Sequence, residues 1–281
     1  MKIKILSDST CDLPKSIIDQ YDIGIFPLTV VKNGENFLDN ITITPADIFN
    51  HVAAGGDLCS TAAGNAAEYQ DLFSQYASQF DYVIHINIGS GFSSSYQNAC
   101  LAAMDFENVI VIDSQNLSTG QGLIVVKAAL LAEKCTDISA LKEEINSFVP
   151  KVEASFVLDQ LKYMAKGGRC SSAAALGANL LNLKPCIEVR DGKMSVVKKY
   201  RGNYAKCLSN YVKDRLSNRD DLDTSLLFLT YTPVEEGDLA AAKDSIAQSD
   251  AKFDLIAEGP AGCTVSCHCG PGTFGILFMR K

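Results

Sequence analysis

The chain has 281 residues, of which 47% are hydrophobic and 21% are charged, with 20 Gly and 8 Pro. This composition is typical of a soluble globular protein and excludes a disordered or fibrous one, and the length allows one large domain or two of ordinary size. The formal net charge of −8 argues against nucleic acid as the main partner, because phosphate binding requires a basic surface.

The N-terminal segment lacks the pattern of a signal peptide. Its apolar run, residues 3–6, is short, and Asp8 follows closely. No stretch approaches the ~18 apolar residues of a membrane-spanning helix, and the best candidate, residues 123–132, is interrupted by Lys127. These features predict a cytoplasmic protein, in which the ten cysteines are expected to be mostly buried free thiols.

The first half of the chain alternates apolar runs with helical patterns, as expected for a parallel sheet covered by helices. The predicted strands are residues 3–6, 25–31, 82–88 and 109–113, and the predicted helices are residues 66–80, 96–104, 119–135 and 138–148. Asn33-Gly34 predicts a hairpin turn, and Thr44-Pro45 predicts a helix N-terminus. The segment Leu58-Cys-Ser-Thr61 has no strong pattern and is expected to be a loop.

The pattern changes near Pro150, where we place the boundary between an N-terminal α/β domain (residues 1–150) and a C-terminal α+β domain (residues 151–281). The predicted strands of the second domain are residues 155–158, 186–189, 195–197 and 226–231, and its predicted helices are residues 161–166, 172–181, 204–216 and 239–247. Asp191-Gly192 predicts a second hairpin. The mixture of short strands and helices favours a mixed or antiparallel sheet.

Three polar segments follow predicted strands, at the edge where open α/β sheets bind their ligands. They are Ser7-Asp-Ser-Thr10, Gly89 to Ser95, and Asp113-Ser114. The glycines and hydroxyls of Gly89 to Ser95 exceed what one helix cap needs, so this loop is expected to bind a phosphate or carboxylate. For Ser7 to Thr10, ordinary helix capping is the favoured interpretation.

The sequence contains no P-loop, and Gly89-x-Gly91 lacks the third glycine of a dinucleotide site. Another chain would therefore have to supply any ATP chemistry. An enzyme alternative is a serine-dependent ester hydrolase that uses Ser93 and His268, although Gly91-Phe-Ser93-Ser-Ser95 lacks the final glycine of a nucleophile elbow. A regulatory protein or scaffold with an empty cleft is the third alternative.

Cys263, Cys267, His268 and Cys269 lie close together near the C-terminus. We interpret this segment as strand-like, in which alternation would point both flanking cysteines away from His268, so buried thiols are favoured over a metal site. His268 precedes Gly270-Pro-Gly272, a predicted turn that suits a ligand-binding loop, and an exposed turn histidine is the alternative.

The other two histidines, His51 and His85, are interpreted as structural. His85 lies within an apolar strand and is expected to be a hydrogen-bonded core residue. Arg169 and Arg201 give the second half basic positions, for which solvated surface charge is the interpretation from the residues alone.

Five motifs stand in a fixed order along nearly the whole chain. They are Ser7-Asp-Ser-Thr-Cys-Asp-Leu13; Ile86-Asn-Ile-Gly-Ser-Gly-Phe-Ser-Ser-Ser-Tyr-Gln-Asn-Ala99; Val111-Ile-Asp-Ser114; Leu161-Lys-Tyr-Met-Ala-Lys-Gly-Gly-Arg169 with Gly177 and Lys184-Pro185; and His268-Cys-Gly-Pro-Gly-Thr-Phe-Gly275. In this order and spacing, the chain resembles the DegV family of bacterial fatty-acid-binding proteins, including the FakB-type subunits of fatty acid kinase.

The resemblance implies two domains, a parallel sheet flanked by helices and an α+β domain with a mainly antiparallel sheet, with a ligand tunnel between them. One long-chain fatty acid, similar to palmitate or oleate, would lie in that tunnel without any cofactor or metal. Its carboxylate would be bound by Thr61, Ser93 and His268. The neighbours expected to support these three residues are Ser60, Gly91, Ser94 and Gly270.

By the same resemblance, the protein would not itself be an enzyme. An ATP-dependent kinase subunit would phosphorylate the bound carboxylate, and the acyl phosphate would feed phospholipid synthesis, with transient membrane contact allowed. Arg169 and Arg201 are expected at the kinase interface. The chain departs from the family pattern at Ala62-Ala63-Gly64, where Ser-Gln-Pro is usual, and at Ser94, where glycine is common.

Overall fold

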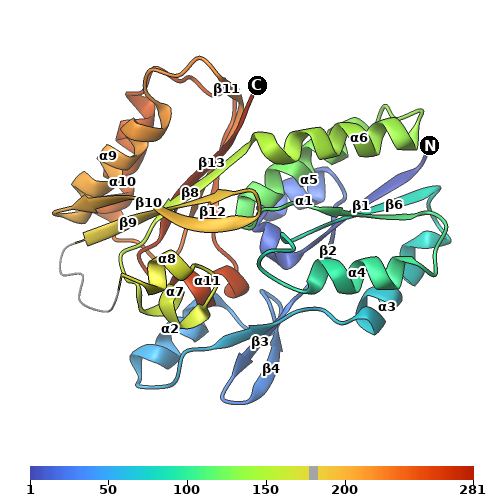
Figure 1. Ribbon diagram of the computed structural model, residues 1–281, viewed down its shortest axis with the longest axis horizontal. Helices are drawn as coiled ribbons and strands as arrows, with labels where there is room; N and C mark the ends of the chain where they lie inside the picture. The colour runs from blue at the N-terminus through green and yellow to red at the C-terminus, as the bar shows by residue number, and fades with distance from the viewer. Residues whose placement is uncertain (177–182) are drawn as a thin grey trace.

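The computed structural model describes residues 1–176 and 183–281 (Figure 1). The predicted helix over residues 172–181 begins as α8 (Ser171–Ala174), and its later part, with Gly177, lies outside the described residues.

The first sheet is parallel and has the order β2-β1-β6-β7. Its strands are β1 (Ile3–Asp8), β2 (Gly24–Phe26), β6 (Tyr82–Asn87) and β7 (Val109–Asp113). Helices cover both faces, α3 (Ala66–Ala77) and α4 (Ser95–Ala103) on one and α5 (Ser118–Ala132) and α6 (Ile138–Phe148) on the other (Figure 1). Successive residues of a strand face opposite layers, so Leu6 packs with α3 and α4 while Ile5 packs with α5. The predicted parallel α/β layer is confirmed.

A separate antiparallel sheet, in the order β4-β3-β5, was not predicted. Its strands are β3 (Thr29–Lys32), β4 (Glu35–Leu38) and β5 (Ser60–Ala62). The strand predicted over residues 25–31 is divided at Pro27, which has no N–H for a ladder, so β2 and β3 belong to different sheets. Asn33 and Gly34, with φ of 54° and 80°, form the predicted hairpin turn.

The prediction of a loop ending at Thr61 was wrong, because Thr61 lies in β5 and pairs with Val30 of β3. That pairing partner lies far away in the sequence, and no local pattern signals it. The helix predicted from Thr44-Pro45 is confirmed as α2 (Pro45–Ala53), where Thr44 and Asp47 form a capping box. A short α1 (Lys15–Gln20) follows Pro14.

The second half forms a six-stranded sheet in the order β10-β9-β8-β13-β11-β12. Its strands are β8 (Val152–Val157), β9 (Leu183–Arg190), β10 (Lys193–Arg201), β11 (Leu222–Tyr231), β12 (Ile256–Pro260) and β13 (Phe274–Arg280). Only β11 and β12 pair in parallel, which confirms a mainly antiparallel sheet. Asp191 and Gly192, with φ of 50° and 69°, form the predicted second hairpin. A domain boundary at residue 150 stays a prediction.

The two faces of this sheet have different partners. Helices α9 (Tyr204–Leu216) and α10 (Glu236–Ala247) cover one face, against Phe274 and Phe278. The opposite face, with Phe156 and Leu277, joins the apolar cluster of α5. The two sheets therefore share one core through α5. Helix α7 (Lys162–Gly167) lies beside α8 (Figure 1).

The segment Cys263–Cys269 is a helix, α11, so its interpretation as strand-like was wrong. Its free N–H groups are satisfied from the other half of the chain: Asp12 Oδ1 accepts from Gly262 N at 2.8 Å, and the Asp39 carboxylate accepts from Cys263 N at 2.8 Å and Thr264 N at 3.2 Å. Side chains that accept from the free N–H groups at a helix N-terminus stabilise the helix, and these acids are more than 220 residues away in sequence.

Because this segment is a helix, the argument that a strand would point Cys267 and Cys269 away from His268 no longer applies. Cys263 and Cys267 share one face of α11 and pack with Val30, Ile48 and Cys59. In residues 1–176 and 183–281, no group of three or more His, Cys, Asp or Glu side chains is placed to hold a metal ion. Over the same residues, no helix has both the length and the apolar character needed to cross a membrane.

His85 is fully buried in β6, but the expected hydrogen bonds are missing. Neither ring nitrogen has a partner among the described residues. The ring instead packs edge-on against Tyr69 and Phe73, with centroid distances of 5.3 and 5.6 Å. Burial lowers the pKa of His85 to about 3, so the ring is neutral and packs as an aromatic core residue.

Candidate functional site

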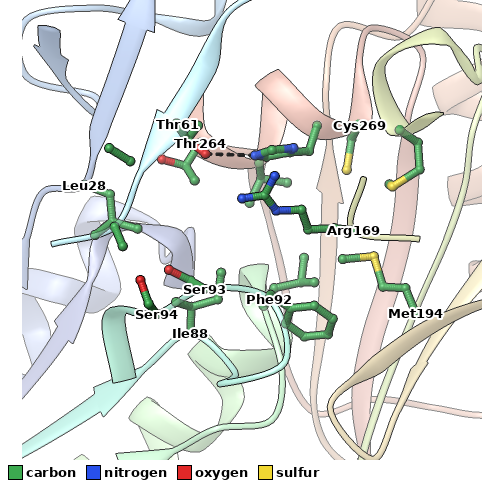
Figure 2. A pocket seen from close by; sticks show the side chains of 16 residues that line it. Leu28, Thr61, Ile88, Phe92, Ser93, Ser94, Arg169, Met194, Thr264 and Cys269 are labelled. Atoms are coloured by element: carbon green, nitrogen blue, oxygen red, sulfur yellow. Dashed lines mark hydrogen bonds between the residues drawn. The ribbon is translucent and has the colours of Figure 1, made fainter. Parts of the chain in front are cut away.

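A cavity of about 170 Å³ lies where the two halves meet (Figure 2). Its walls come from β5, the loop after β6, the N-terminus of α5, α7, β10 and α11. The polar side chains that line it are Thr61, Ser93, Ser94, Arg169, Thr264 and His268. Most of the remaining wall is apolar, including Leu28, Phe92, Met164 and Met194. The structure thus brings the three predicted carboxylate ligands to one cavity.

The serine loop between β6 and α4 is held by acids at the ends of the neighbouring strands. Asp8 accepts from Ile88 N at 2.7 Å, and Asp113 accepts from Ser90 N at 3.0 Å and from Ser90 Oγ at 2.5 Å. A side chain at Gly89 would collide with the backbone at Gln115, 2.8 Å away. The three polar segments at the strand ends therefore form one structure. Asp8 also caps the short turn at Ser9–Cys11 by accepting from Thr10 N, as the capping interpretation expects.

The Ser93 side chain faces the cavity from the end of this loop (Figure 2). Its Oγ lies 2.9 Å from Ser95 Oγ and accepts from Ser95 N at 3.2 Å. The adjacent Ser94 is the N-cap position of α4 and also lines the cavity. The N-terminus of α4 therefore favours a negative group at this wall.

Thr61 and His268 meet on another wall, where Thr61 Oγ1 lies 2.9 Å from His268 Nε2. His268 sits in the last turn of α11, one residue inside the helix, so the prediction that it lies on the glycine-proline turn was wrong. Its Nδ1 is buried without a partner in the described chain, beside Gly167. Burial, and secondly the charge of Arg169, lower the pKa of His268 to about 4, so its ring is neutral at neutral pH.

Two further polar groups in the wall were not predicted as ligands. Thr264 lies one helical turn before His268, and its buried Oγ1 has no partner among the described residues. Arg169, predicted for a kinase interface, lines the cavity, and its Nη1 donates to Gly167 O at 2.6 Å. Correct assignment of α11 as a helix would have identified Thr264. Arg201, at the end of β10, is exposed and does not line the cavity.

The predicted supporting residues have different positions. Ser94 is in the wall, whereas Ser60 is exposed and absent from it. A methyl group at Gly91 would lie 2.1 Å from Gly192 O, so this glycine allows the serine loop to approach the β9–β10 hairpin. Gly270, with φ of 74°, packs on Tyr163 behind the wall. Ala62 and Ala63, which depart from the family pattern, line the cavity.

The site has the character of an anion site at one end of an apolar space. A second cavity of about 30 Å³ adjoins the first through shared wall residues, Leu117, Val265 and Cys269, and extends toward Phe156 and Leu277 of the large sheet. Among the described residues, Ser93 and His268 share no hydrogen bond, because each is bonded to a different partner. The nucleophile–base pair of a hydrolase is therefore not formed.

Known proteins are similar to this chain over its full length. The profile of the family described as "Uncharacterised protein, DegV family" matches residues 2–281. A DegV domain-containing protein of Clostridium acetobutylicum is 33% identical, covering 100% of this chain and 99% of the relative.

Two solved structures are also similar. One, described by its fatty acid binding, is a DegV family protein of Thermus thermophilus, with a TM-score of 0.90, 26% identity and complete coverage of both chains. The other is a stearic acid-binding protein of Eubacterium ventriosum, with a TM-score of 0.84, 25% identity and coverage of 99% of this chain and 98% of that one.

Proposed function

Because the chain belongs to the DegV family, we propose that it binds one long-chain fatty acid between its two halves and presents the carboxylate to an ATP-dependent kinase subunit. The observation that carries this proposal is the set of donors around one end of an apolar cavity. Thr61, Ser93 and His268 come from distant segments and line the same cavity. The similar structures from Thermus thermophilus and Eubacterium ventriosum are described as binding fatty acids.

The physical chemistry of the cavity suits an ionised fatty acid. Each buried CH₂ contributes about 0.8 kcal/mol, so a long chain extending into the second cavity supplies the driving force for binding. A buried carboxylate needs hydrogen-bond donors, since an unpaired buried charge is very costly. Hydroxyls from Thr61, Ser93 and Thr264 supply donors, and Arg169 supplies positive charge at the same end.

The binding half of the proposal is tested by the acyl content of the protein. Protein purified from a bacterial host is expected to carry close to one acyl chain per polypeptide, measured by solvent extraction and mass spectrometry. Protein delipidated and re-exposed to hexadecanoate should regain the same content. An acyl content far below one per chain both before and after re-exposure would contradict fatty acid binding.

The presentation half is tested with a fatty acid kinase. Each of Ser93→Ala and His268→Ala should weaken fatty acid binding about tenfold to a hundredfold, as expected for a lost hydrogen bond to a charged group. Kinase turnover at saturating fatty acid should fall further, because phosphoryl transfer depends on the position of the carboxylate. Wild-type turnover by the double variant would contradict the presenting role.

A further inference from the structure

The hydroxyl of Thr264 is buried in the wall of the main cavity without a hydrogen bond. Thr264 is 6% exposed, and its Oγ1 has no partner among the described residues. Two residues further along α11, Ser266 Oγ donates to Ala261 O at 3.3 Å, so a backbone carbonyl accepts from that hydroxyl. Buried polar groups are nearly always hydrogen-bonded, so the free Thr264 hydroxyl indicates that a polar group of a ligand lies against it.

The backbone of Thr264 is held by Asp39, which belongs to the other half of the chain. Asp39 Oδ2 accepts from Thr264 N at 3.2 Å, and Asp39 Oδ1 accepts from Cys263 N at 2.8 Å. Asp39 is 2% exposed, so bulk water does not compete for these bonds. Because one carboxylate accepts from two consecutive N–H groups, it fixes both the position and the rotation of the first turn of α11.

Asp39 is anchored in turn to Leu28, another residue of the cavity wall. Asp39 N donates to Leu28 O at 2.9 Å. Ser9 Oγ donates to Asp39 Oδ2 at 2.8 Å and accepts from Leu28 N at 3.1 Å. All three residues are buried. The first turn of α11 is thereby joined to the part of the cavity wall that the N-terminal half supplies.

Gly262, the residue before α11, allows the close approach to the N-terminal half. Its N–H donates to Asp12 Oδ1 at 2.8 Å. A Cβ atom at this position would lie 2.7 Å from Asn40 Nδ2 and 2.8 Å from Asp12 Oδ1. Gly262→Ala would therefore push the start of α11 away from Asp39 without changing Asp39 itself.

From these contacts we propose that Asp39 is a positioning residue for the fatty acid headgroup, because it holds Thr264 where the free Thr264 hydroxyl donates to the carboxylate. This inference rests on the proposed function and deepens it, since it names the residue that places a donor of α11. A carboxylate has about four acceptor positions, so it can accept from Thr264 in addition to Thr61 and Ser93. The donors then come from both halves of the chain, and the contact between Asp39 and α11 completes the set.

Thr264→Val tests the ligand role of Thr264, because valine has nearly the same shape without the hydroxyl. The affinity for hexadecanoate is expected to fall about tenfold to a hundredfold, as for a lost hydrogen bond to a charged group. The affinity for hexadecanol should fall less, because its headgroup has no charge. Thr264→Ser keeps the hydroxyl and should retain most of the preference for the acid over the alcohol.

Asp39→Asn tests the positioning role. Asparagine offers one acceptor oxygen in place of two, so at least one of Cys263 N and Thr264 N loses its partner. The affinity for hexadecanoate is expected to fall about threefold to tenfold, as for loss of a typical hydrogen bond. The same substitution should have a much smaller effect in a Thr264→Val background, because Asp39 acts through the Thr264 hydroxyl. Gly262→Ala should show the same dependence on Thr264 and serves if Asp39→Asn does not fold.

Asp137→Ala is the matched control for the loss of a helix cap. Asp137 Oδ1 accepts from Ser139 N at 2.8 Å and from Ala140 N at 3.2 Å at the start of α6, and Asp137 does not line the cavity. This variant should lower stability without changing the ratio of hexadecanoate to hexadecanol affinity.

The outcomes distinguish the roles of Thr264 and Asp39 from the function on which they rest. An unchanged ratio of the two affinities in Thr264→Val overturns the ligand role of Thr264. An equal effect of Asp39→Asn with and without the Thr264 hydroxyl overturns the positioning role of Asp39. A wild-type protein that fails to bind hexadecanoate overturns the proposed function instead.

Discussion

Asp12 is a buried acid that joins the two halves of the molecule. Its Oδ1 accepts from Gly262 N at 2.8 Å, and its Oδ2 accepts from Ser118 Oγ at 2.6 Å. Burial, with smaller contributions from the neighbouring Asp39 and Asp8, raises the pKa of Asp12 to about 8, although the hydrogen bonds from Ser118 and Gly262 act in the opposite direction. The carboxyl is therefore largely protonated in the folded protein near neutral pH.

This pKa makes stability depend on pH in a defined direction. Between its ordinary value of 3.8 and about 8, Asp12 keeps a proton in the folded state that the unfolded state has released. The free energy of unfolding therefore falls as pH rises through this window. Asp12→Asn has no titrating carboxyl at this position, so its free energy of unfolding should lack this pH dependence. Urea denaturation at several pH values should then show the wild type losing stability relative to the variant as pH rises. Parallel profiles would contradict a protonated Asp12.

At the residue scale, the sequence predicted three residues that the structure brings to one cavity, but it did not predict the other polar groups of the cavity wall. Ser93, Thr61 and His268 followed from the resemblance, and the glycine- and serine-rich loop independently indicated an anion site. Thr264 was missed because α11 was interpreted as a strand. The position of Arg169 in the cavity wall depends on where α7 ends against α11, and no local pattern encodes that contact.

At the element scale, the serine loop lies close to the second half of the chain at Gly91. A Cβ there would lie 2.1 Å from Gly192 O, a backbone atom that can move only with the β9–β10 hairpin. Gly91→Ala should therefore separate the two elements, lower stability by about 1–3 kcal/mol, and weaken fatty acid binding. Chemical denaturation and ligand titration measure the two effects.

Gly237→Ala is the matched control for that substitution. Gly237 lies in α10, and an added methyl group would meet nothing within 4 Å. Since alanine favours a helix over glycine by up to about 1 kcal/mol, this variant should be neutral or slightly more stable and should bind fatty acid normally. Equal behaviour of the two variants would show that the contact at Gly91 does not matter.

Elements with strong local patterns were predicted, and those that depend on distant partners were not. The capping box of α2, the two hairpins and the helices α4, α5, α6 and α9 each carry their own signals in sequence. In contrast, β5 exists through pairing with β3, and α11 exists through acids near the other end of the chain. Both of these elements carry site residues, so the site was harder to predict than the scaffold.

At the scale of the whole molecule, the two arginines predicted for a partner interface occupy different environments, one in the cavity wall and one on the exposed surface. Arg169 lines the cavity, so Arg169→Glu would place negative charge beside the carboxylate and should weaken fatty acid binding. Arg201 is exposed outside the cavity, so Arg201→Glu should leave binding unchanged and reduce the rate of association with an acidic kinase surface.

Fatty acid titration and kinase turnover, measured on both variants, test this separation. Loss of fatty acid binding in Arg201→Glu would show that Arg201 acts on the pocket or the fold. Normal kinase turnover and association in that variant would show that Arg201 does not lie in the kinase interface.

The central claim is that a fatty acid carboxylate lies between Thr61, Ser93 and His268, and carbon-13 NMR of carboxyl-labelled hexadecanoate tests it most directly. The account predicts a single bound carboxyl signal whose chemical shift changes in Thr61→Val, Ser93→Ala and His268→Ala, because each removes a group at the carboxylate. Ser60→Ala, at an exposed neighbour outside the cavity, should leave the signal where it is. The absence of a bound signal, or a signal unchanged in all three site variants, would contradict the account.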